Sequence, residues 1–141
     1  MTDASETTSA PSSAGPPAIE RMRKRPQFLA CAQGASCAKG AVMVQALARQ
    51  DGSAIVRAGF TATKRVGGAV VRNRAKRRLR EAARLLLPQF GHPGFDYVFV
   101  ARGGTPNRPW PRLLDDVKSA LLRLAPENVR RAPAPPTSPA A

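Results

Sequence analysis

The sequence is poor in the residue types that build most enzyme sites. Among its 141 residues are only 2 cysteines and 1 histidine, and aromatic residues make up 5%. Cys31, Cys37 and the distant His92 fall short of the four ligands of a structural zinc site. His92 lies in the sequence Gly-His-Pro-Gly, which is typical of a turn, so we interpret it as a loop residue. The sequence therefore predicts neither a catalytic residue nor a metal ligand in this protein.

Long apolar runs and paired carboxylates are missing too. No stretch approaches the roughly 20 apolar residues that a membrane-spanning helix needs, and residues 1–17 contain Asp3 and Glu6 but no apolar core of a signal peptide. No phosphate-binding loop of the Gly-x-x-x-x-Gly-Lys-Ser/Thr type is present. Asp115 and Asp116 are neighbours on a predicted helix and would point about 100° apart, unlike a pair that holds two metals. We expect a cytoplasmic protein without a membrane partner.

Positive charge is what the chain has in excess. It carries 23 Lys and Arg against 9 Asp and Glu, which gives a formal net charge of +14. Such an excess repels itself and calls for an anionic partner. Nucleic acid is the first candidate and an acidic membrane surface the second, and composition alone does not separate RNA, DNA and anionic lipid. Hydrophobic residues make up 43%, which predicts a folded core rather than a disordered basic tail.

Composition and periodicity divide the chain into one domain and two tails. Both ends are rich in proline and small residues, and we predict disordered tails at 1–19 and 126–141 around a single α+β domain at 20–125. The predicted elements are a helix between Pro26 and Gly34, strands at 41–49 and 54–63, a helix at 69–87 that Pro88 ends, a strand at 95–102 and a helix from Pro111 to Pro126. The Asp51-Gly52 dipeptide predicts that the first two strands form a hairpin. The order αββαβα is typical of a small two-layer sandwich.

The helix at 69–87 and the residues before it hold more than half of the net charge. Between positions 64 and 84, Glu81 is the only acid, and the bases are Lys64, Arg65, Arg72, Arg74, Lys76, Arg77, Arg78, Arg80 and Arg84. Helical spacing predicts a buried stripe of Val71, Ala75, Leu79, Ala82 and Leu86. The face opposite this stripe carries Asn73, Lys76, Arg77, Arg80 and Arg84.

Two interpretations of this charged face compete. A solvated helix usually interleaves glutamate with lysine, whereas this face is dominated by arginine, whose planar fork matches phosphate oxygens. The side of the helix opposite the charges lacks the Trp or Phe typical of a membrane-surface helix. We therefore favour a polyanion-binding face over a merely solvated one.

The segment from Lys64 to Glu81 resembles the signature of the bacterial ribonuclease P protein component. It reads Lys-Arg-Val-Gly-Gly-Ala-Val-Val-Arg-Asn-Arg-Ala-Lys-Arg-Arg-Leu-Arg-Glu, and the family shows Lys-Lys/Arg-x-Gly-x-Ala-Val-x-Arg-Asn-Arg-x-Lys-Arg-x-x-Arg-Glu. The resemblance extends over about residues 21–124 and leaves out both tails. Gly68 departs from the asparagine that the family commonly has there, although glycine is tolerated at a helix cap.

This resemblance implies a ribonucleoprotein that removes the 5′ leader from precursor tRNA. Its large RNA subunit would bind the catalytic Mg²⁺ ions and cut the phosphodiester, while the small protein docks on that RNA, contacts the leader and improves substrate and metal affinity. The protein alone would bind no cofactor and would need no protein partner. The family fold is an α+β sandwich with a left-handed βαβ crossover, which here would join 54–63 to 95–102 through the basic helix.

The resemblance also assigns roles to individual residues by position. Lys64 is expected on a backbone phosphate of the leader, and Phe28 on a leader base, although a plain core aromatic is an equal alternative for Phe28. The predicted RNA-binding residues, from the resemblance and the helical projection together, are Arg65, Arg72, Asn73, Arg74, Lys76, Arg77, Arg80 and Arg84.

Two other functions stay open at this point. A ribosome-associated or DNA-binding structural protein could use the same helix without any role in cleavage. A protein-only nuclease is the second, and the lack of grouped carboxylates or histidines argues against it.

Overall fold

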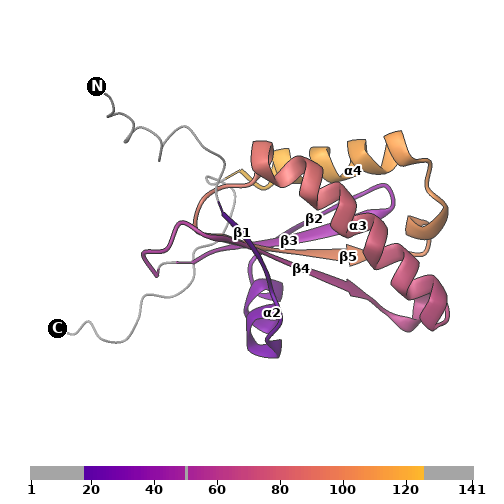
Figure 1. Cartoon of the computed structure of the whole chain (residues 1–141), viewed down its shortest axis with the longest axis horizontal. Coiled ribbons are helices and arrows are strands. Elements are labelled where there is room, and N and C mark those ends of the chain that lie inside the picture. Colours follow the sequence, from indigo (N-terminus) through magenta and orange to yellow (C-terminus); the bar gives the residue numbers. More distant parts are fainter. Residues whose placement is uncertain (1–17, 50, 126–141) are drawn as a thin grey trace, which may run out of the picture.

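Three α-helices and a five-stranded mixed sheet make up the described part of the chain. The computed structural model describes residues 18–49 and 51–125 (Figure 1). In chain order the elements are β1 (Ile19–Arg21), α2 (Arg25–Ala32), β2 (Ala35–Lys39), β3 (Val42–Ala48), β4 (Val56–Ala62), the 3₁₀ turn η2 (Lys64–Val66), α3 (Ala69–Phe90), β5 (Phe95–Ala101), the 3₁₀ turn η3 (Thr105–Asn107) and α4 (Trp110–Arg123).

The predicted α+β class and the predicted order αββαβα are confirmed, with two strands added. Strands β1 and β2 were not expected, because β1 has only three residues and β2, Ala-Ser-Cys-Ala-Lys, contains no β-branched residue. Strand β1 begins at Ile19, one residue before the predicted start of the domain. The tails predicted to be disordered lie outside the described residues, apart from this boundary.

The strand order in the sheet is β1-β4-β5-β3-β2. Strand β5 therefore lies between β3 and β4, and the predicted hairpin between these two strands is wrong. The hairpin that forms joins β2 to β3, with Lys39 paired to Val42 around a two-residue turn whose Gly40 has φ 52°. Asp51-Gly52 does mark a change of direction, but the strand that follows it pairs with β1 and β5 instead.

Helix α3 connects two parallel neighbours. Strands β4 and β5 run parallel, from the pair Arg57–Asp96 to the pair Ala62–Ala101, and α3 is the connection between them. The predicted connection of these two strands through the basic helix is therefore present.

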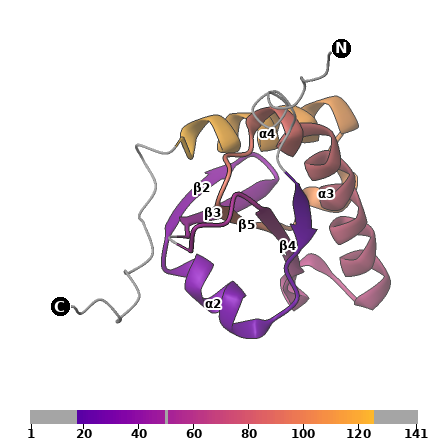
Figure 2. The same ribbon diagram turned by 60° about the vertical axis from the view of Figure 1, so that its left-hand side comes forward.

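The helices lie on both faces of the sheet. Helices α3 and α4 cover one face and α2 lies against the other (Figures 1 and 2). The main core is on the α3 and α4 side, where Tyr97, Phe99 and Leu79 are among the largest fully buried side chains. A smaller core on the α2 side contains Met22, Cys31, Leu47 and Val98.

The end of α3 differs from the prediction. Pro88 lies inside the helix, which continues to Phe90, although proline removes one backbone hydrogen bond. The ring of Phe90 packs against the main core and lies 5.5 Å from the Lys118 ammonium, and the Gly91 N–H donates to the Leu87 carbonyl. These contacts hold the last turn in place beyond the proline. Within the described residues, no helix is both long enough and apolar enough to cross a bilayer.

Candidate nucleic-acid interface

The outward side of α3, together with η2, carries the predicted RNA-binding residues. We call these eight residues the basic ridge: Arg65, Arg72, Asn73, Arg74, Lys76, Arg77, Arg80 and Arg84. None of them is buried; Arg72, Lys76 and Arg80 are half-buried and the others are exposed. Arg78 lies in the same segment, but the sequence analysis gave it no role in RNA binding. Its side chain is turned toward η3.

The inward side of α3 packs on the sheet and on α4. Its buried residues include Ala75, Leu79 and Ala82, as predicted, and also Ala83 and Leu87. The two ends of the predicted apolar stripe are less well covered, since Val71 is 37% exposed and Leu86 is only partly buried. The helical period does not tell on which side of the stripe the buried face extends. In the structure it extends to the side that carries Ala83 and Leu87.

Few acidic side chains of the described residues neutralise the positive charge of the ridge. Glu81 pairs with Arg84, and this hydrogen bond lowers the pKa of the Glu81 carboxyl. Among the residues that the structure describes, the other ridge side chains form no hydrogen bond or ion pair. Like charges at i and i+4, as in Lys76 and Arg80, destabilise a helix. The free guanidinium groups are therefore available to an anion, and an anion would relieve their repulsion.

A groove lies beside the ring of Phe28, between the end of β1, α2 and β4. It has a volume of about 360 Å³ and is lined by Arg21, Met22, Arg23, Phe28 and Phe60. The Phe28 ring is half-buried and lies over Gly59, where an added Cβ would come within 2.5 Å of a ring carbon. Phe28 is thus part of the smaller core and part of the groove wall at once.

The residues that line this groove differ in part from the predicted leader contacts. Lys64, the second predicted leader contact, is exposed in η2 but does not line it. Arg21 and Arg23, which do line it, were given no role by the sequence. Their signal was the basic run that leads into the first helix. Phe60 packs on Phe99 at 5.4 Å between ring centroids and also contributes to the groove.

A second groove, of about 530 Å³, lies between β1 and α3. Its floor includes Ile19, Ala58 and Leu87, and the ridge residues Arg80 and Arg84 contribute to its lining. The two grooves share Arg21 and Phe60. The basic ridge is therefore continuous with two concave surfaces at the β1 edge of the sheet.

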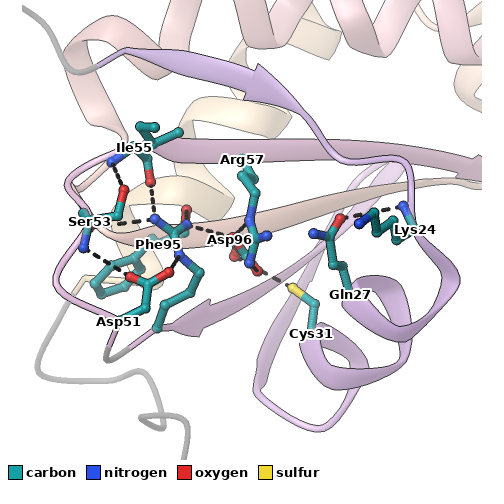
Figure 3. A network of polar contacts seen from close by, with 10 residues as sticks. Lys24, Gln27, Cys31, Asp51, Ser53, Ile55, Arg57, Phe95 and Asp96 are labelled. Atoms are coloured by element: carbon teal, nitrogen blue, oxygen red, sulfur yellow. Dashed lines mark hydrogen bonds and ion pairs between the residues drawn. The ribbon is translucent and has the colours of Figure 1, made fainter.

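Another group of arginines lies near the start of β4, away from the basic ridge, and binds a buried carboxylate (Figure 3). Asp96, 1% exposed, accepts hydrogen bonds from Arg49 at 2.7 Å and from two nitrogens of Arg57 at 2.7 and 2.8 Å. The hydrogen bond to Asp96 raises the pKa of Arg57. Arg49 also donates to the carbonyl of Ile55 at 2.5 Å. Arg49 also pairs with the exposed Asp51 at 3.0 Å, so two carboxylates balance the two guanidinium groups of this cluster.

The described residues offer no metal site. Among residues 18–49 and 51–125, no three His, Cys, Asp or Glu side chains come together in a way that could hold a metal ion. Asp96 and Asp116 each face arginines. His92 lies in the loop after α3, as predicted, and its backbone N–H donates to the Tyr97 hydroxyl at 3.1 Å.

Comparison with known proteins agrees with this arrangement. The ribonuclease P family profile matches residues 17–125. The ribonuclease P protein component of Caulobacter vibrioides is 62% identical over 107 residues, which cover 76% of this chain and 72% of that protein. The corresponding protein of Ruegeria pomeroyi is 53% identical over 108 residues, or 75% of this chain and 86% of that one.

A solved structure supports the same assignment. The ribonuclease P protein of Thermotoga maritima superimposes with a TM-score of 0.62 at 27% identity, over 74% of this chain and 96% of that one. Because the profile spans the whole described domain and the identity to the curated relatives is high, this chain belongs to the bacterial ribonuclease P protein component family.

Proposed function

We propose that this chain is the protein subunit of a ribonucleoprotein ribonuclease P, in which it binds the catalytic RNA and the 5′ leader of precursor tRNA and assists Mg²⁺-dependent removal of the leader. The observation that carries the proposal is the basic ridge, a row of mostly charged, exposed or half-buried side chains on α3 and η2. Within the described residues, Arg84 is the one ridge side chain with an ion-pair partner. Family membership supplies the class of RNA.

The ridge is suited to a sugar–phosphate backbone. Arginine side chains bind phosphate oxygens through two parallel N–H groups, and the binding of each phosphate releases condensed counterions, which makes affinity salt-dependent. Seven of the eight ridge residues are presented by one helix of 22 residues, so their spacing is set before RNA arrives. We assign the docking of the RNA subunit to this surface.

The groove beside Phe28 is suited to a single-stranded leader. A half-buried aromatic ring at the wall can stack on an unpaired base, and Arg21 and Arg23 line the same groove, where they can meet the phosphates on either side. The exposed Lys64 in η2 is proposed as a further phosphate contact. This arrangement accounts for both alternatives raised for Phe28, because the ring serves the core and the groove.

The bond cleavage is assigned to the RNA subunit together with its Mg²⁺ ions. The described residues hold no cluster of ligands that would fit the metal. The part of the chain is electrostatic: a ridge and groove of positive charge lower the repulsion between two polyanions, the RNA subunit and the precursor tRNA.

A cleavage assay tests the function as a whole. Precursor tRNA is incubated at low Mg²⁺ with the RNA subunit alone, the protein alone, or both. We expect mature 5′ ends only when both are present. Cleavage by the protein alone would indicate a protein-only nuclease, and binding without any stimulation of cleavage would indicate a structural nucleic-acid-binding protein.

A salt titration tests the ridge. In the Arg77→Ala/Arg80→Ala double variant, the slope of log K against log salt for the RNA subunit should fall by about 0.7–0.9 for each lost phosphate contact. Arg112→Ala, which removes an exposed arginine of α4 outside the ridge, is the matched control and should keep the wild-type slope. Wild-type affinity and slope in the double variant would contradict the proposed docking surface.

A comparison of two tRNA substrates tests the groove. Phe28→Leu keeps an apolar side chain over Gly59 but removes the aromatic face, and stacking is worth about 1–3 kcal/mol per base. We expect the holoenzyme to lose affinity for precursor tRNA while its affinity for mature tRNA is unchanged. An equal effect on both substrates would mean that Phe28 acts only in packing.

A further inference from the structure

Arg78 lies within the basic segment but is bound to the protein itself. Its guanidinium donates one hydrogen bond to the Thr105 carbonyl at 2.6 Å and another to the Arg108 carbonyl. The group lies 5.8 Å from the centre of the Trp110 ring. The side chain is half-buried, and burial lowers its pKa, with the charge of Arg74 adding to the effect. Two of its nitrogens are thus committed to backbone oxygens of the segment that joins β5 to α4.

The segment that accepts these bonds is itself tied to the rest of the fold. The Thr105 hydroxyl, fully buried, donates to the Ala41 carbonyl and accepts from the Arg102 N–H at 2.9 Å. Arg108 donates to both carboxylate oxygens of Asp116, at 3.0 and 3.2 Å. Asp116 also accepts from the Ala41 N–H at 3.0 Å. A continuous chain of hydrogen bonds therefore runs from α3 through η3 to α4 and the β2–β3 turn.

We infer that Arg78 is a positioning residue that fixes the basic helix against η3 and α4, and that it is not one of the groups that hold the RNA. The inference rests on the proposed function only for its consequence on RNA binding. A planar guanidinium can donate to two carbonyls at once in a fixed fork, whereas a lysine ammonium is a compact point charge on a flexible stem. Two adjacent arginines, Arg77 and Arg78, thus have different tasks.

The difference can be measured with Arg78→Ala, Arg78→Lys and Arg77→Ala in the full chain, titrated with the ribonuclease P RNA subunit at several salt concentrations. Arg78→Ala should weaken binding while keeping the wild-type slope of log K against log salt, whereas Arg77→Ala should lower that slope by about 0.7–0.9. Arg78→Lys should not restore wild-type affinity, because its charge is kept but its two-carbonyl fork is lost.

A second measurement, without RNA, keeps the test independent of the proposed function. Both Arg78 variants should speed amide hydrogen exchange of Thr105, Asn107 and Ala41 and lower the melting temperature by about 5–10 °C, while Arg77→Ala changes neither. A lowered salt slope in Arg78→Ala, full rescue by Arg78→Lys, or unchanged exchange at η3 would overturn the inference. If Arg77→Ala and Arg77→Ala/Arg80→Ala keep the wild-type slope while exchange at η3 still rises in the Arg78 variants, the proposed docking surface fails and the positioning role stands.

Discussion

The arginines at the Asp96 end of the sheet and the arginines on the ridge differ in what surrounds them. Arg49 and Arg57 meet the buried Asp96 carboxylate and a set of backbone carbonyls, and Arg49 also pairs with the exposed Asp51. Two carboxylates thus neutralise the two guanidinium groups within the fold. The ridge arginines project from α3 with Glu81 as the single acid in their segment. The same residue type is thus neutralised by carboxylates in one region and lacks such partners among the described residues in the other.

The largest loss of stability is expected from removing the Asp96 carboxylate. Asp96→Ala leaves the partly buried Arg57 without a carboxylate and leaves Arg49 with only the exposed Asp51, and removing one partner of a buried ion pair costs about 3–5 kcal/mol. The free energy of unfolding, measured in urea, should fall by that amount. Asp115→Ala, at an exposed carboxylate of α4, should stay within about 0.5 kcal/mol of wild type. A loss at Asp96 no larger than this control would mean that the buried cluster does not stabilise the fold.

An intermediate effect is expected from alkaline pH at the same end of the molecule. Cys31 donates from its thiol to the Asp96 carbonyl, and burial, followed by the charge of Asp96, raises the pKa of Cys31 from 9.0 to about 12. The folded chain therefore keeps a proton that the unfolded chain releases. Stability should be complete below about pH 9 and decline as the pH rises toward about 12.

A second buried group acts in the same direction. Burial raises the pKa of Tyr97 from 10.0 to about 12, so its contribution is lost from about pH 10 upward. Chemical denaturation across this range should show the decline in wild type, and Cys31→Ala should delay its onset by about one pH unit. Cys37→Ala is the control, and a delay of the same size in that variant would rule out the role of Cys31.

The smallest effect on stability is expected on the ridge itself. Arg77→Ala removes an exposed cation without a described partner, so the free energy of unfolding should change by no more than about 0.5 kcal/mol. Arg57→Ala, measured beside it in urea, should be clearly destabilised because it leaves half of the Asp96 carboxylate unpaired. Equal losses in the two variants would erase the contrast between neutralised and free arginines.

Local patterns were enough to predict the ridge and the helices. The period of α3 and its excess of charge are both visible within about 20 residues, and the resemblance carried by positions 64–81 added the family. The hairpin was mispredicted because Asp51-Gly52 reports a turn but not the partner of the strand that follows it. The insertion of β5 between β3 and β4 depends on non-local pairing, which no local pattern encodes.

The roles of single arginines were predicted least well. Asp96 lies 47 positions from Arg49 and 39 from Arg57. No local sequence pattern could therefore predict that these three residues pair. The helical projection leaves Arg78 off the outer face on which it places Arg77, but it does not show what Arg78 binds, because the acceptor Thr105 lies 27 positions away. Identifying that acceptor required the position of η3, which the fold supplies and the helical projection does not.

The central place of β5 bears on how the protein is made. It is synthesised after α3, yet it is the strand that joins β3 to β4. While a nascent chain ends before Phe95, these two earlier strands have no common neighbour. The arginines of α3 are therefore synthesised before the sheet that supports the helix is complete. Such long-range closure slows folding. The basic ridge should therefore be held against a complete sheet only once translation has passed β5.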